Sequence, residues 1–214
     1  MKILRVVKKD SRNVKVCFDN DQMLYINYEL FLKYGLRKND EISESDINSL
    51  IKENQKFAVK QRAYRYLSRR HHSENELRIK LKQKKYDENI IEEIIGNLKE
   101  NNYLNDLEFA EIFSGENIKN KYWGRNKVKA ELIKKGISSK IISQVLSEKF
   151  PGGNDLQNAI GLAEKKIKSL SSRNLEKKKL KEKIYTHLFS KGYDYETAKE
   201  AVEKLINLDA EDLV

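Results

Sequence analysis

The stretch SENELRIKLKQKKYDENIIEEIIGNL, residues 73–98, decides the fold because its pattern returns twice further along the chain. With Leu81, Leu132 and Leu188 set in register, an apolar residue precedes each leucine by four positions, and a tyrosine or isoleucine follows it by five. Mostly apolar pairs follow after nine to fourteen positions. Spacings of three and four place such residues on one face of a helix. Each copy therefore predicts a helix, a tight corner and a second helix.

The distance between the copies indicates how many helices each one contains. The anchor leucines lie 51 and 56 residues apart, which is longer than the common two-helix solenoid repeats and leaves room for three helices. One proline and nine glycines in 214 residues leave most helices uninterrupted. We expect a mainly α protein built from three tandem three-helix repeats in an elongated array.

Residues 2–26 differ from the rest of the chain. Three short β-rich runs, KILRVVK, NVKVCF and QMLYIN, are separated by polar turns at 10–13 and 19–21. This pattern predicts a small β-meander. Because so small a sheet is marginal alone, we expect it to pack on a helix at 28–34 that ends at Gly35. A docking or capping module is the favoured role, and a nucleic-acid-binding barrel is the alternative.

Cap and turn signals divide the chain into four parts. Ser73 and Glu76 have the spacing of a capping box, and the clearest break is PGGN at 151–154. The expected parts are a β-rich module at 1–42, a linker helix with the first repeat at 43–106, the second repeat at 107–150, and the third repeat with an acidic tail at 151–214.

Composition limits the partners and the compartment. The net charge of +10 favours a polyanionic partner or an acidic protein surface. A single cysteine excludes an intramolecular disulfide and cysteine-rich zinc sites, and it fits a reducing cytoplasm. No run approaches the roughly 18 apolar residues of a membrane span. We expect a cytoplasmic monomer with no cofactor and no membrane partner.

Basic residues concentrate on the helix before each corner. Residues 51–86 carry twelve basic and three acidic residues, whereas 87–118 carry one basic and nine acidic. If the repeats stack regularly, equivalent helices align and form a basic stripe, although charged residues also simply solvate helix surfaces. The predicted filament- or DNA-binding residues are Arg62, Arg65, Arg69, Arg70, Lys80, Lys84, Lys85, Arg125, Lys127, Lys129, Lys134 and Lys135.

Tyr122 and Trp123 stand beside Lys119, Lys121 and Arg125. Such a pair can stack on an exposed base or anchor a protein interface. It can also fill the corner between two helices, and this is the commoner use.

Two other classes of protein fit the residues less well. A helix-turn-helix reader would place its second helix in the major groove, but that helix begins with Asp87-Glu88 in the first repeat, which phosphates would repel. The third repeat has Glu196, Glu200 and Glu203 in the equivalent place, whereas the second repeat, with Ser138-Ser139-Lys140, escapes this objection. An enzyme would need a convergent site, and the sequence contains no phosphate loop, metal-ligand spacing or nucleophile–base arrangement. We therefore expect neither catalytic residues nor a metal site.

Four segments resemble the RecX family, regulators of the bacterial recombinase RecA. They are SENEL at 73–77 with Leu81, YLND at 103–106 with Phe109-Ala110, GRNKVKAELIKKGI at 124–137, and SKGY at 190–193. Together they fall within residues 58–205, and the N-terminal meander resembles that of the longer family members. One departure is Lys85, where the other two repeats have glycine, which leaves the geometry of the first corner open.

The resemblance implies three tandem three-helix units in a curved shape that binds the groove of a RecA–DNA filament. It implies a regulator, without catalytic residues, that inhibits the recombinase and coprotease activities of RecA and so modulates DNA repair and the SOS response. RecA and its filament are the implied partners, with single- and double-stranded DNA as further candidates. The alternative is a helical-repeat nucleic-acid-binding protein that acts without RecA.

Overall fold

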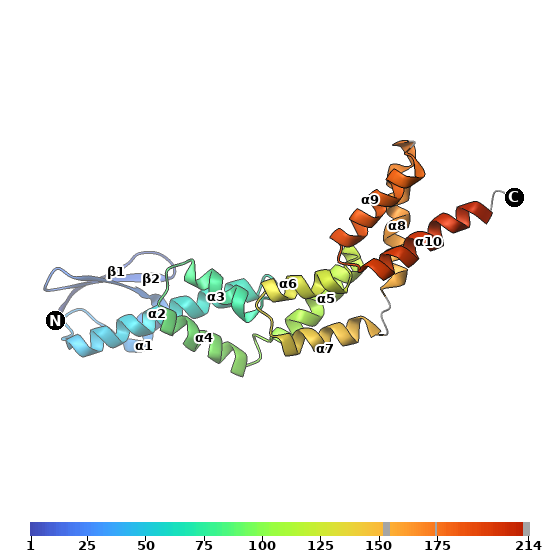
Figure 1. Cartoon of the computed structure of the whole chain (residues 1–214). Helices are drawn as coiled ribbons and strands as arrows, with labels where there is room; N and C mark the ends of the chain where they lie inside the picture. Colours follow the sequence, from blue (N-terminus) through green and yellow to red (C-terminus); the bar gives the residue numbers. More distant parts are fainter. Residues whose placement is uncertain (152–154, 174, 212–214) are drawn as a thin grey trace. The chain divides into compact units, whose positions relative to one another are not determined.

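The computed structural model describes residues 1–151, 155–173 and 175–211. Within them, three β-strands precede ten α-helices (Figure 1), so the mainly α prediction is confirmed. The described chain forms two compact units. The first comprises Met1–His72 and Leu77–Leu104, and the second comprises Ser73–Glu76 with the described residues from Asn105 onward. None of the described helices combines the length and apolar character needed to span a bilayer.

The N-terminal sheet is the predicted meander. Strands β1 (Ile3–Lys8), β2 (Asn13–Phe18) and β3 (Met23–Asn27) are antiparallel in the order β1-β2-β3. Helix α1 (Tyr28–Tyr34) follows directly and ends at Gly35 in the left-handed conformation, as expected. The sheet's buried face packs on α1 and on the start of α2, and its core residues are Ile3, Val14, Val16, Phe18, Ile26, Leu30, Ile47 and Leu50.

Helix α2 (Glu44–Leu67) serves two cores. Ser43 caps its start by accepting a hydrogen bond from the backbone N–H of Asp46 at 3.1 Å. Its first half packs on the sheet, whereas Val59 and Ala63 pack against α3 (Glu74–Lys82) and α4 (Glu88–Glu100). The predicted linker helix is therefore also the first helix of the first repeat.

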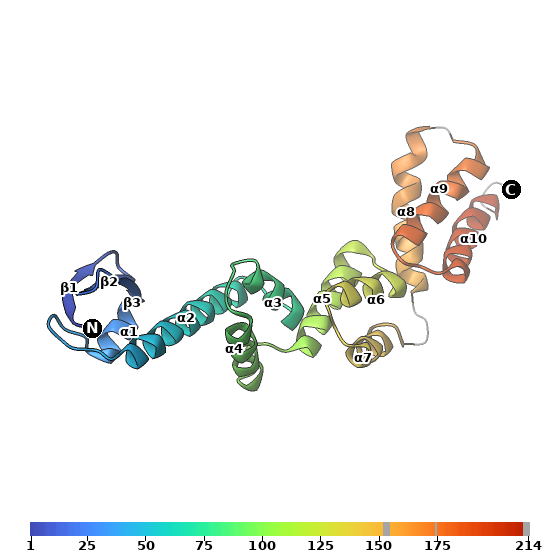
Figure 2. The same cartoon turned by 60° about the vertical axis from the view of Figure 1, so that its left-hand side comes forward.

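The second unit contains the other two three-helix groups. Helices α5 (Asp106–Lys121), α6 (Arg125–Lys134) and α7 (Ser139–Lys149) share one apolar core. Helices α8 (Leu156–Leu170), α9 (Lys177–Ser190) and α10 (Tyr195–Glu211) share another and lie side by side (Figure 2), with the short 3-10 helix η2 (Ser171–Arg173) after α8. Of the predicted acidic tail, residues 209–214, the first three residues belong to α10 and the last three, 212–214, lie outside the described residues.

All three corners have the same backbone conformation. The φ angles of Lys85, Gly136 and Gly192 are 59°, 77° and 90°. The left-handed region suits a helix C-terminus, where glycine is usual. Lys85 therefore keeps the corner geometry, even though a residue with a side chain is strained there by roughly 1–2 kcal/mol.

The reason for glycine at two corners is a contact between consecutive repeats, which we call a joint. In the first joint, the Ser73 hydroxyl donates to the carbonyl oxygen of Lys135 at 2.7 Å, and a Cβ on Gly136 would lie 2.5 Å from that of Asn75. Both partners lie in the second unit.

The second joint repeats the first in register. The backbone N–H of Gly124 donates to the carbonyl oxygen of Lys191 at 2.8 Å, and a Cβ on Gly192 would lie 2.2 Å from the backbone nitrogen of Lys127. In both joints, the start of the helix that precedes one repeat's corner thus packs on the corner of the next repeat. Because no repeat precedes the first, its corner can carry Lys85.

An aspartate completes each joint. Asp106 accepts a hydrogen bond from the backbone N–H of Glu74 at 2.8 Å, and Asp155 accepts one from Arg125 at 3.2 Å. The other carboxylate oxygen of Asp155 is buried without a hydrogen-bond partner among the described residues. Burial first, and then the nearby Asp194 carboxylate, raise the pKa of Asp155 above its usual 3.8.

The raised pKa predicts how Asp155 affects stability. A carboxyl group that is harder to ionise in the folded state costs stability at neutral pH, and this cost disappears as the pH falls through its raised folded pKa toward the unfolded value near 3.8. Asp155→Asn keeps an oxygen for the Arg125 N–H and removes the charge. We expect the variant to be more stable than the parent at neutral pH, with the difference shrinking toward pH 4.

Urea unfolding curves at several pH values would measure this difference. Asp194→Asn is the matched variant, because asparagine can still cap α10 by accepting from the Thr197 N–H, which Asp194 does at 2.8 Å. It should reduce the pH dependence without abolishing it. A pH-independent difference between parent and Asp155→Asn would contradict the assignment.

Candidate functional site

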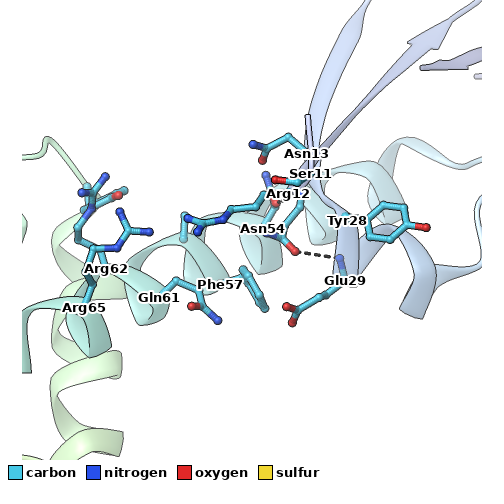
Figure 3. A pocket seen from close by; sticks show the side chains of 13 residues that line it. Ser11, Arg12, Asn13, Tyr28, Glu29, Asn54, Phe57, Gln61, Arg62 and Arg65 are labelled. Carbon is cyan, nitrogen blue, oxygen red and sulfur yellow. Dashed lines mark hydrogen bonds between the residues drawn. The ribbon is translucent and has the colours of Figure 1, made fainter. Parts of the chain in front are cut away.

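A polar cleft of about 550 Å³ lies in the first unit, between the β1–β2 turn and α2 (Figure 3). Arg12 approaches it from the turn, and Arg62 and Arg65 approach it from α2. Glu29 is the one carboxylate among the lining residues. The remaining lining residues are Ser11, Asn13, Asn27, Tyr28, Asn54, Phe57, Ala58, Gln61 and Tyr86.

The turn holds Arg12 in place through its backbone. One Asp10 carboxylate oxygen accepts the backbone N–H groups of Arg12 at 2.7 Å and Asn13 at 2.8 Å. The Asn13 side chain, followed by the Arg12 N–H, lowers the pKa of Asp10. The Arg12 carbonyl oxygen accepts from the Tyr28 N–H at 2.7 Å. With both of its backbone polar groups bonded, Arg12 presents its side chain from a defined position.

Asn54 ties the other wall of the cleft to the sheet. Its side-chain oxygen accepts from the Asn27 N–H at 2.9 Å, and its amide donates to the Tyr25 carbonyl oxygen at 2.8 Å. Arg62 and Arg65 follow two and three turns later on α2, three residues apart and hence on neighbouring positions of one face. Guanidinium groups bind phosphate and carboxylate in paired hydrogen bonds. The cleft is therefore suited to an anionic group.

The other predicted residues of the first unit lie outside the cleft. Arg69, Arg70, Lys84 and Lys85 are exposed. Lys80 is half-buried, and its ammonium lies 2.8 Å from Nε2 of His72 and 5.2 Å from the Tyr66 ring centre. It therefore contributes to the packing of its own unit.

The predicted residues of the second unit are partly neutralised. Glu131 pairs with Lys127 at 3.5 Å and with Lys134 at 2.8 Å, and the Lys134 hydrogen bond is the main reason that its pKa is lowered. Lys135 pairs with Glu76 at the first joint. Arg125 and Lys129 are exposed. The predicted stripe therefore carries less net charge on α6 than its lysines alone suggest.

The aromatic pair is half-buried and takes part in packing. Tyr122 joins the core of the third repeat, and its hydroxyl accepts from Lys165 at 2.7 Å. Trp123 joins the core of the second repeat, edge-on to Phe113 with ring centres 5.9 Å apart. These contacts match the corner-filling alternative, and stacking on a base stays a prediction.

Sequence patterns missed Arg12 and Asn54 as cleft residues. Asp10 and Asn13 signal a turn, but only tertiary packing brings Arg12 beside α2. Within the described part of the chain, no group of three or more His, Cys, Asp or Glu residues is placed to hold a metal ion.

Three family models match successive parts of the chain. They are the first, second and third three-helix domains of RecX, at residues 60–98, 105–146 and 154–202. The chain belongs to the RecX family. Regulatory protein RecX of Clostridium perfringens (strain SM101 / Type A) is 34% identical over 204 residues, 95% of each chain. That of Clostridioides difficile is 32% identical over the full length of both chains.

Solved RecX structures share the fold. A crystal structure of regulatory protein RecX has a TM-score of 0.67 at 23% identity and covers 93% of this chain and 98% of its own. RecX from Lactobacillus salivarius has a TM-score of 0.62 at 24% identity and covers 72% of this chain and 97% of its own. The three-helix repeats are thus confirmed, whereas the domain boundaries at 42, 106 and 150 remain predictions.

Proposed function

We propose that this protein binds RecA and RecA–DNA filaments in the cytoplasm and inhibits recombinase and coprotease activity. It thereby modulates DNA repair and the SOS response. The observation that carries the proposal is the succession of all three RecX domains along one chain. The protein acts by binding as a monomer, without catalytic residues or a cofactor.

The polar cleft of the first unit is the part of this chain that supports binding to an anionic target. Arg12, Arg62 and Arg65 line it with one opposing carboxylate, Glu29. The acidic groups offered by a protein–DNA filament are phosphates and carboxylates, and both accept paired hydrogen bonds from arginine. Lys84, Lys85 and Lys129 are exposed and add sites for weaker, salt-sensitive contacts.

The direct test adds the protein to RecA on single-stranded DNA, first at substoichiometric and then at equal amounts. We expect ATP hydrolysis and strand exchange to fall across this range. Unchanged activities would refute the proposal and favour the alternative, a helical-repeat nucleic-acid-binding protein that acts without RecA. For that alternative, affinity for free DNA should fall with salt by a logarithmic slope of about −0.7 per phosphate contact on single strands.

Charge reversal tests the cleft itself. The double variant Arg62→Glu/Arg65→Glu should weaken filament binding by about tenfold or more, because each lost charge-assisted contact is worth roughly 1.5–3 kcal/mol. Arg37→Glu/Lys38→Glu changes the net charge equally at two exposed residues of the same unit that do not line the cleft. It should have little effect. Equal losses from the two variants, with both still folded by circular dichroism, would mean that net charge rather than the cleft determines binding.

A further inference from the structure

The third repeat contains a second basic cavity that the predicted stripe does not include. Its volume of about 600 Å³ is within the usual range for ligand sites. Residues of α8, η2 and α9 line it. Helices α8 and α9 lie next to each other in Figure 2. Its charged and titratable lining residues are Lys166, Arg173, Lys179, Glu182, Lys183 and His187. The lining therefore carries four permanent cations and one carboxylate, and one of the cations, Lys179, also pairs with Glu176 at 3.5 Å.

The repeat register explains why this surface retains its positive charge. With Leu132 and Leu188 aligned, His187 takes the place of Glu131, and Lys183 takes that of Lys127. In the second repeat, Glu131 pairs with Lys127 at 3.5 Å. The third repeat has an imidazole where that carboxylate would be. The corresponding lysine therefore lacks the carboxylate that neutralises its counterpart.

The surroundings of His187 are those of an anion site. Burial first, and then the charges of Lys166 and Lys191, lower the pKa of its ring. Arg173 and Lys183 add positive charge around the cavity, opposed by Glu182 in the lining and by Glu176 beside it, which pairs with Lys179. A bound anion would reverse this effect, because a nearby negative charge favours the protonated ring.

Neutral hydrogen-bond donors play a smaller part. The hydroxyl of Thr186 donates to the carbonyl oxygen of Glu182 at 2.8 Å, and that of Ser190 donates to the carbonyl oxygen of His187 at 2.7 Å. Each hydroxyl has one proton, so neither can donate it to a ligand while these bonds last. Recognition therefore falls to the cationic groups, and the ligand must carry negative charge.

We propose that this cavity binds consecutive phosphate groups of a phosphate chain. Lysine ammonium groups bind phosphate as point charges, and the guanidinium of Arg173 can pair with two oxygens of one phosphate group. The volume accommodates more than one such group. The phosphate chain can come from a nucleic-acid backbone or from free polyphosphate. The proposal does not depend on RecA, so a test without RecA can fail or succeed independently of the proposed regulatory function.

The test measures binding of the full chain to an oligothymidylate single strand and, separately, to inorganic tripolyphosphate. Lys183→Gln should weaken binding about tenfold, as expected for loss of one charge-assisted contact, and reduce the logarithmic salt slope on the single strand by about 0.7. Lys178→Gln removes the same charge from an exposed position on α9 that does not line the cavity, and it should change affinity by less than about twofold.

His187 provides a readout at the cavity itself. The chain has three histidines, so comparison with His187→Gln assigns the His187 signal in a proton NMR titration. Either probe, when bound, should raise the pKa of His187 in the parent and raise it less in Lys183→Gln. His187→Glu supplies the carboxylate that the second repeat has, and it should abolish binding at this cavity.

The pattern of outcomes identifies the phosphate source. A raised His187 pKa with oligothymidylate alone supports a nucleic-acid backbone, and one with tripolyphosphate alone supports a free phosphate chain. A raised His187 pKa with both probes shows that phosphate groups alone are sufficient for binding at this cavity. An unchanged pKa at saturating probe, equal weakening by Lys178→Gln and Lys183→Gln, or equally tight binding of polyglutamate would each overturn the proposal.

Discussion

Gly192→Ala is expected to lower the free energy of unfolding by about 2–6 kcal/mol. The φ angle of Gly192 is 90°, and a side chain in such a region costs roughly 1–3 kcal/mol. The added Cβ would also lie 2.2 Å from the backbone nitrogen of Lys127, and relief of such overpacking costs roughly another 1–3 kcal/mol. Since the obstacle is backbone, a rotamer change cannot remove it.

Urea unfolding measures the total loss, and amide hydrogen exchange locates it. Gly124 and Asn126 donate backbone hydrogen bonds across this joint to the carbonyl oxygens of Lys191 and Gly192, at 2.8 and 3.2 Å. Their amides should exchange faster in the variant. A stability within about 0.5 kcal/mol of the parent would show that the joint is not tightly packed.

Two other substitutions separate backbone strain from the joint contact. Gly115→Ala lies within α5, where nothing is within 4 Å of the new Cβ, so it should stabilise the helix by up to about 1 kcal/mol. Lys85→Gly changes the corner of the first repeat, which has a φ of 59° but takes part in no joint. This substitution should therefore relieve roughly 1 kcal/mol of backbone strain. Loss of stability in Gly192→Ala alone would assign the cost to the joint.

The repeat itself was predictable because helical spacing acts over short distances. A period of three to four residues determines which side chains share a face, so Leu81, Leu132 and Leu188 could be assigned to the core, and all three are fully buried. The meander and the helix that ends at Gly35 followed from similarly local turn signals.

The joints and the cleft were not predictable because they connect distant residues. Ser73 and Lys135 are 62 positions apart, and nothing in either segment indicates which repeat it contacts. The same applies to Arg12 and α2. Charge patterning overestimated the net positive charge of the α6 surface. The spacing of four residues between Lys127 and Glu131, which allows them to pair, was nevertheless visible in the sequence.

The anchor leucines are the other positions at which large effects are expected. Leu81→Ala, Leu132→Ala and Leu188→Ala each leave a cavity at a site with 0% exposure. Each should lower the free energy of unfolding by about 2–5 kcal/mol. The loss combines the transfer energy of the removed methyl groups with the cost of the remaining cavity, so it depends on how far the neighbouring helices can collapse.

Ile133→Ala is the matched control for the second repeat. Ile133 is adjacent to Leu132 on α6 but is 57% exposed, so truncation should change stability by no more than about 0.5 kcal/mol. Trp123, the single tryptophan, packs in the same core as Leu132, and its fluorescence reports unfolding of that repeat directly. Leu132→Ala should shift this transition to lower urea, whereas Ile133→Ala should leave it in place. Equal shifts would mean that α6 does not bury the face to which the alignment of Leu81, Leu132 and Leu188 assigns Leu132. The alignment of the three repeats would then be wrong at this position.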